Sequence, residues 1–361
     1  MGESQKFLTL FQKAETGAPL TIAFLGGSIT EGSLASSEDT CFAYRVFLWF
    51  EEMFPKTDFT YVNAGVGGTT SHFGAARVHD DVIAKGPDFV CIDFSVNDEG
   101  DEAFFEETFE GVVRQLLSAR TQPALLVLAN ARYDDGRTFE AVHKRIADHY
   151  GIPVVSLQKS AFFKDVRNGK TKMSKITPDG LHPNDLGHEK LAELIEKRLL
   201  EIREEVRGAA RAENGSAIPA PLTRNGYEHT RRYTALNASP SLSGFSYLAR
   251  PAAERTKVFH DCFAADKEGD AITFSLPDCS SIAVQYRQVP NRPAVCVSAV
   301  IDKDTEHAVI LDGAFPETWG ENLALTVLRD HGPFGDHTLT LKAVKAGRQD
   351  APFLLTSVIT D

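Results

Sequence analysis

The stretch GGSIT at residues 26–30 places Ser28 directly after a short apolar run, residues 20–25. Two glycines let the backbone turn sharply where a side chain would clash, so the serine is held at the end of a predicted strand. Ligands bind at this end of the strands in open parallel sheets. Such a serine can act as a nucleophile if an imidazole takes its proton. The alternative is that GGS only begins an ordinary helix.

The stretch TPDGLHPNDLGH at residues 177–188 supplies an imidazole and a carboxylate. Asp179 and His182 fall in a turn before the last predicted helix, so the carboxylate can bind one ring nitrogen and fix the tautomer. The other ring nitrogen is then left to face Ser28. These residues predict a catalytic triad, although a capped turn around a histidine without catalytic function fits the same spacing. We expect His188 to be a solvated helix residue.

Two further segments offer hydrogen-bond donors for the negative oxygen of an acyl-transfer transition state. The first, VNAGVGGTTS at residues 62–71, ends its predicted strand in a glycine loop whose Gly68 N–H can approach a substrate closely. The second, DFSVND at residues 93–98, ends its strand with the amide side chain of Asn97. Each residue alone also suits an ordinary turn.

Three other known motifs with similar loops do not match these residues. The stretch GGSITEG lacks the Gly-Lys-Ser/Thr ending of a phosphate-binding P-loop, and GVGGTT has Thr70 where a dinucleotide fingerprint needs glycine. The nucleophile elbow G-x-S-x-G fails because Thr30 occupies the position of its last glycine. A serine hydrolase built on Ser28 is therefore of another kind.

The segments between these motifs predict an α/β fold for the first half of the chain. Short apolar runs alternate with amphipathic stretches of helix length, a rhythm typical of a parallel sheet covered by helices. We expect a flavodoxin-like three-layer sandwich with a five-stranded parallel sheet. The strands are expected at residues 20–25, 59–63, 88–94, 124–130 and 153–157, and helices at 41–54, 101–120 and 138–150.

The second half of the chain has a different pattern. A final amphipathic helix runs into a segment rich in charge, Ala, Gly and Pro, where we place a domain boundary near residue 210. The expected domains are residues 1–210, catalytic, and 211–361, an accessory all-β sandwich that is jelly-roll-like. Its strands are expected at residues 271–276, 281–287, 294–301, 307–311, 323–328, 337–344 and 353–360.

The four motifs, in this order and each after a predicted strand, resemble the SGNH (GDSL-type) hydrolase superfamily over about residues 18–204. The resemblance implies a nucleophile at Ser28, a base at His182 oriented by Asp179, and an oxyanion hole. The oxyanion hole consists of the N–H groups of Ser28 and Gly68 and the amide of Asn97. The chain departs from the family in having GGS for Gly-Asp-Ser, and in a serine, Ser95, where many members have glycine.

Members with GGSIT and VND resemble carbohydrate acetylesterases, in which an attached β-sandwich is common. The resemblance implies a serine esterase that removes O-acetyl groups from oligosaccharides and needs no cofactor. Trp319, in the loop FPETWGEN, is a candidate for stacking on a sugar ring at the domain junction. Alternatively, it fills the sandwich core or an interdomain contact. The rival functions are a lysophospholipase or thioesterase with the same triad, and a non-catalytic carbohydrate-binding protein.

Composition limits the partners. A formal charge of −12 disfavours nucleic acid and anionic membrane surfaces. We expect a soluble cytoplasmic protein, because no apolar run approaches the ~18 residues of a membrane span and the start lacks a secretory signal.

We expect no metal site: the five cysteines lack metal-ligand spacing, and His79, Asp80 and Asp81 look like a solvated helix face. The oligomeric state stays open.

Overall fold

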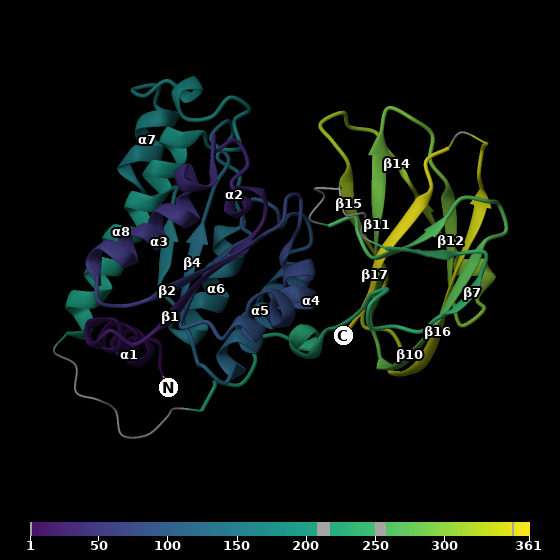
Figure 1. Ribbon diagram of the computed structural model, residues 1–361, viewed down its shortest axis with the longest axis horizontal. Coiled ribbons are helices and arrows are strands. Elements are labelled where there is room, and N and C mark those ends of the chain that lie inside the picture. The colour runs from purple at the N-terminus through teal and green to yellow at the C-terminus, as the bar shows by residue number, and fades with distance from the viewer. Residues whose placement is uncertain (1, 208–216, 250–257, 349) are drawn as a thin grey trace. The chain divides into compact units, whose positions relative to one another are not determined.

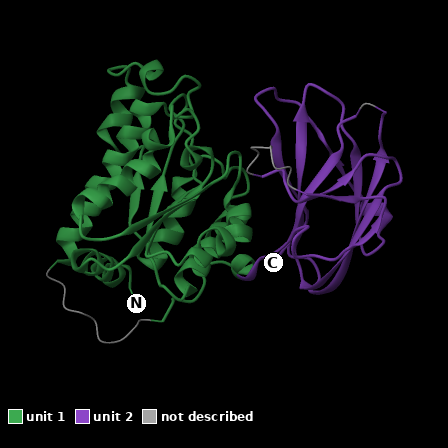
Figure 2. Cartoon of the chain, viewed as in Figure 1, with its two compact units in different colours: residues 1–228 green, residues 229–361 purple. Residues whose placement is uncertain are grey.

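The computed structural model describes residues 2–207, 217–249, 258–348 and 350–361. Its contacts divide the chain into two compact units, Met1–Glu228 and His229–Asp361 (Figure 2). The boundary that the sequence suggests near residue 210 lies outside the described residues. Among the residues described, no helix combines the length and the apolar character that a membrane crossing requires.

The first unit is built on a five-stranded, all-parallel sheet with the strand order β2-β1-β3-β4-β5 (Figure 1). This is the order of flavodoxin-like folds, so the predicted architecture is confirmed. The strands are β1 (Leu20–Gly26), β2 (Phe59–Gly65), β3 (Phe89–Asp93), β4 (Ala124–Ala129) and β5 (Val154–Ser156).

Helices cover both faces of this sheet because alternate side chains of a strand point to opposite faces. In β1, Ile22 and Phe24 join one buried cluster, whereas Ala23 and Leu25 join the other. Three helices pack on the first face: α1 (Glu3–Thr16), α3 (Phe42–Met53) and α8 (Asp185–Val206). Three pack on the second: α4 (Ser71–Asp81), α5 (Glu102–Ser118) and α6 (Glu140–Tyr150). Shorter helices are α2 (Ser28–Glu31), α7 (Ala161–Arg167), η1 (Glu38–Thr40), η2 (Ile83–Lys85), η3 (Met173–Lys175) and η4 (Gly226–His229).

The described segment that follows α8, residues 217–228, packs back onto α5. The Glu110 carboxylate accepts hydrogen bonds from the N–H groups of Leu222 (2.7 Å) and Thr223 (2.8 Å). Arg114 donates to Glu228 at 2.7 Å, with both side chains largely buried. These bonds fix the end of the first unit to its own helix.

The second unit contains two sheets packed on one core. One sheet has the order β13-β12-β16-β10-β7, and the other has β14-β11-β17-β9-β8 with β15 and β6 paired to β11 and β17. Phe274 and Leu339 from the first sheet share a buried cluster with Val284 and Phe353 from the second, which makes the unit a β-sandwich. All seven predicted strands are present, as β10 (Ala271–Cys279), β11 (Ile282–Pro290), β12 (Cys296–Ile301), β13 (Val309–Asp312), β15 (Asn322–Arg329), β16 (Gly335–Lys345) and β17 (Phe353–Thr360). Shorter strands are β6 (Arg231–Tyr233), β7 (Ser241–Ser243), β8 (Ser246–Leu248), β9 (Cys262–Ala265) and β14 (Ala314–Phe315), and one short helix, η5 (Thr305–His307), precedes β13.

Candidate active site

Ser28 opens the short helix α2 at the carboxyl end of β1, and its hydroxyl meets a histidine from the loop before α8. The distance from Ser28 Oγ to His182 Nε2 is 2.8 Å, a hydrogen bond between residues 154 positions apart in the chain. Gly27 leaves room for the Asn97 side chain at this turn, because a Cβ on Gly27 would lie 2.4 Å from Asn97 Oδ1 and displace the amide. The turn therefore holds the serine hydroxyl against the imidazole.

Asp179 binds the other ring nitrogen of His182. Its Oδ2 lies 2.7 Å from His182 Nδ1, and its Oδ1 accepts the N–H groups of Leu181 (2.9 Å) and His182 (2.8 Å). Burial alone would raise the pKa of Asp179, but the hydrogen bonds from the His182 ring and these N–H groups outweigh it and lower the pKa to about 2. Asp179 is thus a carboxylate that keeps the Nδ1 proton on the ring, which leaves Nε2 free to accept the proton of Ser28.

Both predicted oxyanion segments lie next to the turn that carries Gly27 and Ser28. A Cβ on Gly67 would stand 3.7 Å from Ser28 Cβ, so the glycine loop after β2 runs beside the serine. Gly68 is exposed and has φ of +70°, a conformation that favours glycine. Asn97 contacts Gly27 from the turn after β3. Within the described part of the chain, the N–H groups of Ser28 and Gly68 make no hydrogen bond, which leaves both available to a ligand.

A buried arginine, which the sequence analysis did not single out, holds the ends of β1 and β2 together. Arg77 on α4 is fully buried and donates to the carbonyl oxygens of Gly26 (2.9 Å) and Ala64 (2.7 Å). Its Nη1 also pairs with Asp81 Oδ2 at 2.9 Å. The two strand ends that precede Ser28 and Gly68 are therefore fixed by one guanidinium.

Asp93, at the end of β3, is hydrogen-bonded to the short helix α2 that begins at Ser28. Its Oδ2 accepts hydrogen bonds from Thr30 Oγ1 (3.1 Å) on α2 and from Asn130 Nδ2 (3.0 Å) after β4. Burial raises the pKa of Asp93 to about 7, although both hydrogen bonds act in the opposite direction. Burial thus favours the protonated form of a carboxyl group that is hydrogen-bonded to the helix carrying Ser28.

The prediction that His188 is solvated is wrong. The residue is fully buried, and its ring joins two segments: Nδ1 accepts the Phe42 N–H (3.3 Å) and Nε2 donates to the Ser33 carbonyl (3.3 Å). His188 lies three and seven positions before Leu191 and Ile195, which are buried on the same helix face. This helical spacing in the sequence could have predicted that His188 is buried. Burial lowers the pKa of His188 to about 4, so the ring is neutral.

His79 and Asp80 differ from Asp81 in their surroundings. His79 and Asp80 bind each other at 2.9 Å with both side chains exposed, as expected for a solvated face, whereas Asp81 pairs with the buried Arg77. Across residues 2–207, 217–249, 258–348 and 350–361, the structure contains no group of three side chains suited to hold a metal ion.

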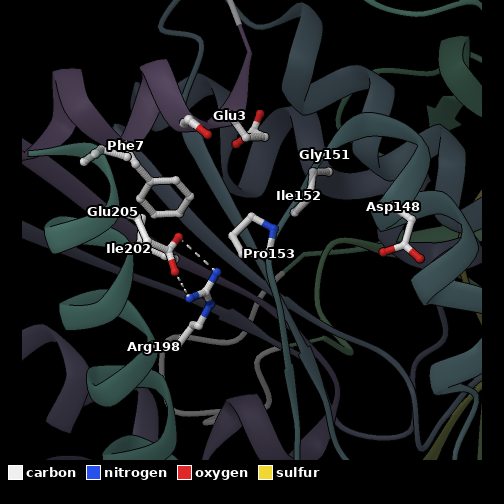
Figure 3. A pocket seen from close by; sticks show the side chains of 11 residues that line it. Glu3, Phe7, Asp148, Gly151, Ile152, Pro153, Arg198, Ile202 and Glu205 are labelled. Carbon is white, nitrogen blue, oxygen red and sulfur yellow. Dashed lines mark hydrogen bonds and ion pairs between the residues drawn. The ribbon is translucent and has the colours of Figure 1, made fainter. Parts of the chain in front are cut away.

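A separate hollow of about 300 Å³ is lined by residues of α1, α6 and α8 and by the segment that precedes β5 (Figure 3). Its charged side chains all have ion-pair partners. Arg198 pairs with Glu205 within the lining at 2.7 Å, whereas Glu3 pairs with Lys6 (2.7 Å) and Asp148 with Lys144, two lysines outside it. The hollow is distinct from the Ser28 site, because none of its lining residues belongs to that site.

Trp319 belongs to the second unit and is 65% exposed. Its ring packs edge-on against Phe315, with centroids 5.0 Å apart and planes at 84°. The indole is therefore not a core residue of the sandwich, and its edge contact with Phe315 leaves much of the ring exposed.

Comparisons with known proteins show that this chain is similar to ester hydrolases. Residues 24–190 match the model of the GDSL-like Lipase/Acylhydrolase family. The crystal structure of a two-domain esterase (CEX) active on acetylated mannans is 40% identical, has a TM-score of 0.92, and is matched over 99% of this chain and 95% of its own. A structure of a two-domain esterase (CEX) active on acetylated mannans that was co-crystallized with mannopentaose is 41% identical, with a TM-score of 0.91, over 98% of this chain and 94% of its own. An acetylxylan esterase from Geobacillus stearothermophilus is 28% identical over 204 residues, which are 49% of this chain and 92% of that protein.

The buried His188 predicts an acid-sensitive first unit. Its pKa falls from 6.5 in the unfolded chain to about 4 in the fold, so between these values only the unfolded chain binds the proton. The free energy of unfolding should therefore fall by about 3 kcal/mol as the pH drops from 6.5 to 4. His188→Gln should be less stable at neutral pH but should lose less on acidification.

Urea unfolding followed by Trp49 fluorescence measures this effect. A Trp319→Phe background removes the second of the two tryptophans and makes Trp49 a reporter of the first unit alone. If the free energy of unfolding falls equally with pH in the wild type and in His188→Gln, His188 is not the cause of the acid sensitivity.

Asp179→Asn should lower kcat by about 10³- to 10⁴-fold, because an asparagine amide can stabilise the wrong imidazole tautomer. Since the pKa of Asp179 is about 2, wild-type activity at mildly acidic pH should not be limited by its protonation. Steady-state kinetics of ester hydrolysis at several pH values will show whether the variant stays impaired throughout. Recovery of the variant at any pH would indicate another function for Asp179.

Proposed function

Because the chain belongs to the GDSL-like lipase/acylhydrolase family and is a carboxylic ester hydrolase, we propose that it is a serine esterase that removes O-acetyl groups from oligosaccharides. The observation that carries the proposal is the hydrogen-bonded chain from Ser28 through His182 to Asp179, at 2.8 and 2.7 Å. A relative that is 40% identical over nearly the full length of both chains acts on acetylated mannans. No cofactor enters the reaction.

The reaction proceeds in two steps. Ser28 Oγ attacks the acetyl carbonyl carbon while His182 Nε2 takes its proton, and the tetrahedral intermediate expels the sugar hydroxyl with that proton. Water then attacks the acetyl-serine with His182 again as base, which releases acetate and restores Ser28. In both steps the negative oxygen is stabilised by the N–H groups of Ser28 and Gly68 and by the Asn97 amide.

An acetylated oligosaccharide suits the charge of the protein. A net charge of −12 repels polyanions but leaves neutral sugars unaffected. The exposed Trp319 offers a flat apolar face of the kind that packs on sugar rings. A cytoplasmic location stays a prediction.

The second candidate, a lysophospholipase or thioesterase, uses the same triad on a longer acyl chain. The two functions differ in what they gain from each added methylene, because burial in an apolar groove contributes about 0.8 kcal/mol per CH₂. We expect kcat/KM to be highest for acetyl esters and to fall toward decanoyl esters in a series of p-nitrophenyl esters. Efficiency that rises steadily with chain length would favour the second candidate.

Trp319→Ala should raise KM for acetylated mannooligosaccharides by about 2- to 12-fold, the equivalent of about 0.5–1.5 kcal/mol of ring stacking. KM for p-nitrophenyl acetate should not change, because that ester carries no sugar. Phe334→Ala is the matched control, since Phe334 is a similarly exposed aromatic residue of the same unit, at 74%. A rise for both esters, or the same rise in the Phe334 variant, would refute a sugar-binding function for Trp319.

A further inference from the structure

The turn after β3 directs two adjacent residues to opposite sides. The N–H groups of Asn97 and Asp98 both donate to the Phe94 carbonyl, at 2.9 and 3.0 Å, which makes the turn tight. Asn97 lies partly exposed beside Gly27, whereas the Asp98 side chain is fully buried. The position of one side chain is therefore coupled to that of the other.

Asp98 also holds the start of helix α4. Its Oδ1 accepts the Ser71 N–H at 2.8 Å. The residue that precedes the helix, Thr70, makes no capping bond with its own side chain. Because the first N–H groups of a helix have no partner within the helix, the Asp98 carboxylate caps α4 from another segment. Gly68 lies only three residues before Ser71, so this bond anchors the glycine loop.

His143 on α6 fixes the other oxygen of this carboxylate. Its Nε2 lies 2.8 Å from Asp98 Oδ2, and the two side chains are 1% and 0% exposed. The ring stacks on Phe109 with centroids 3.9 Å apart and planes at 6°. Nδ1 has no hydrogen-bond partner among the residues that the structure describes, so the bond to Asp98 is the polar contact that the ring makes there.

We infer that Asp98 and His143 form a positioning pair for the oxyanion hole, which holds the Gly68 loop and the Asn97 amide at the spacing that the transition-state oxygen requires. The inference rests on the proposed esterase function. Neither side chain contacts the reacting atoms. Asp98 is bonded through Ser71 to one oxyanion segment and through the backbone to the other, and His143 prevents the carboxylate from rotating. A small displacement of such donors is costly, since a misplacement of about 1 Å can lower a rate about 10²-fold.

Two substitutions of Asp98 separate this function from a purely structural one. Asp98→Asn retains an oxygen that can accept the Ser71 N–H, whereas Asp98→Ala removes it. With p-nitrophenyl acetate, we expect Asp98→Ala to lower kcat by about 10- to 100-fold, because oxyanion donors act in the transition state, and KM to change by less than about twofold. Asp98→Asn should recover most of kcat.

Substitutions of His143 keep the test decisive if Asp98→Ala does not fold. His143→Gln can place its amide nitrogen near the position of Nε2 and should retain activity, while His143→Leu should lower kcat in the manner of Asp98→Ala. The matched control is Glu3→Ala, because Glu3 is also a buried carboxylate that accepts a backbone N–H, that of Leu125 at 3.0 Å. It lies at the amino ends of the strands, so its loss should lower stability without lowering kcat.

The outcomes are distinct. A kcat loss confined to Asp98→Ala and His143→Leu, with recovery in Asp98→Asn and His143→Gln, supports the inference. Equal kcat in all folded variants, or a stability loss like that of Glu3→Ala without a kcat effect, overturns it alone. A wild-type enzyme that hydrolyses no acetyl ester overturns the esterase function and this inference with it.

Discussion

The hydrogen bond between Ser28 and His182 places the strictest demand on the fold, since its partners are 154 residues apart and must meet within 2.8 Å. The parallel sheet meets this demand by bringing every strand's carboxyl end to one edge. β1 brings Ser28 there, β2 and β3 bring the glycine loop and Asn97, and α8 follows the loop that carries His182. The chemistry thus depends on a sheet whose own residues take no part in it.

Buried charged and polar side chains, and not only apolar contacts, hold the backbone segments around the site. Arg77 holds the ends of β1 and β2, Asp93 holds α2, and Asp98 holds the start of α4. Burying such groups costs free energy that hydrogen bonds must offset, and apolar residues of similar volume would often stabilise a fold more. Directional bonds place backbone segments more strictly than apolar contacts do, which explains why these groups gather at the sheet edge that carries the site.

Most features that depend on neighbouring residues in the chain, such as strands and turns, could be predicted from the sequence. Short apolar runs identified the strands, and the turns after β1, β2 and β3 identified Ser28, Gly68 and Asn97 as candidates, because a short strand followed by a glycine or polar turn has a distinct pattern. The supporting groups were missed for a physical reason: Arg77, Asp98 and His143 are buried by contacts with distant segments, and a buried charged residue looks like a surface residue in sequence. His188 was misread although its spacing to Leu191 placed it on the buried face of α8. The docking of residues 217–228 on α5 depends on Glu110, and an acidic residue on an amphipathic helix gives no local signal of that contact.

Reaction with a fluorophosphonate, which transfers its phosphonyl group to an activated serine, tests the central claim most directly. The labelled protein would be digested and its peptides identified by mass spectrometry, with residual esterase activity measured on the same sample. The account predicts one phosphonyl group, on the peptide that contains Ser28, and loss of activity in proportion to labelling, with neither in Ser28→Ala. Labelling of another serine, or a folded Ser28→Ala protein that still hydrolyses acetyl esters at the wild-type rate, would contradict it.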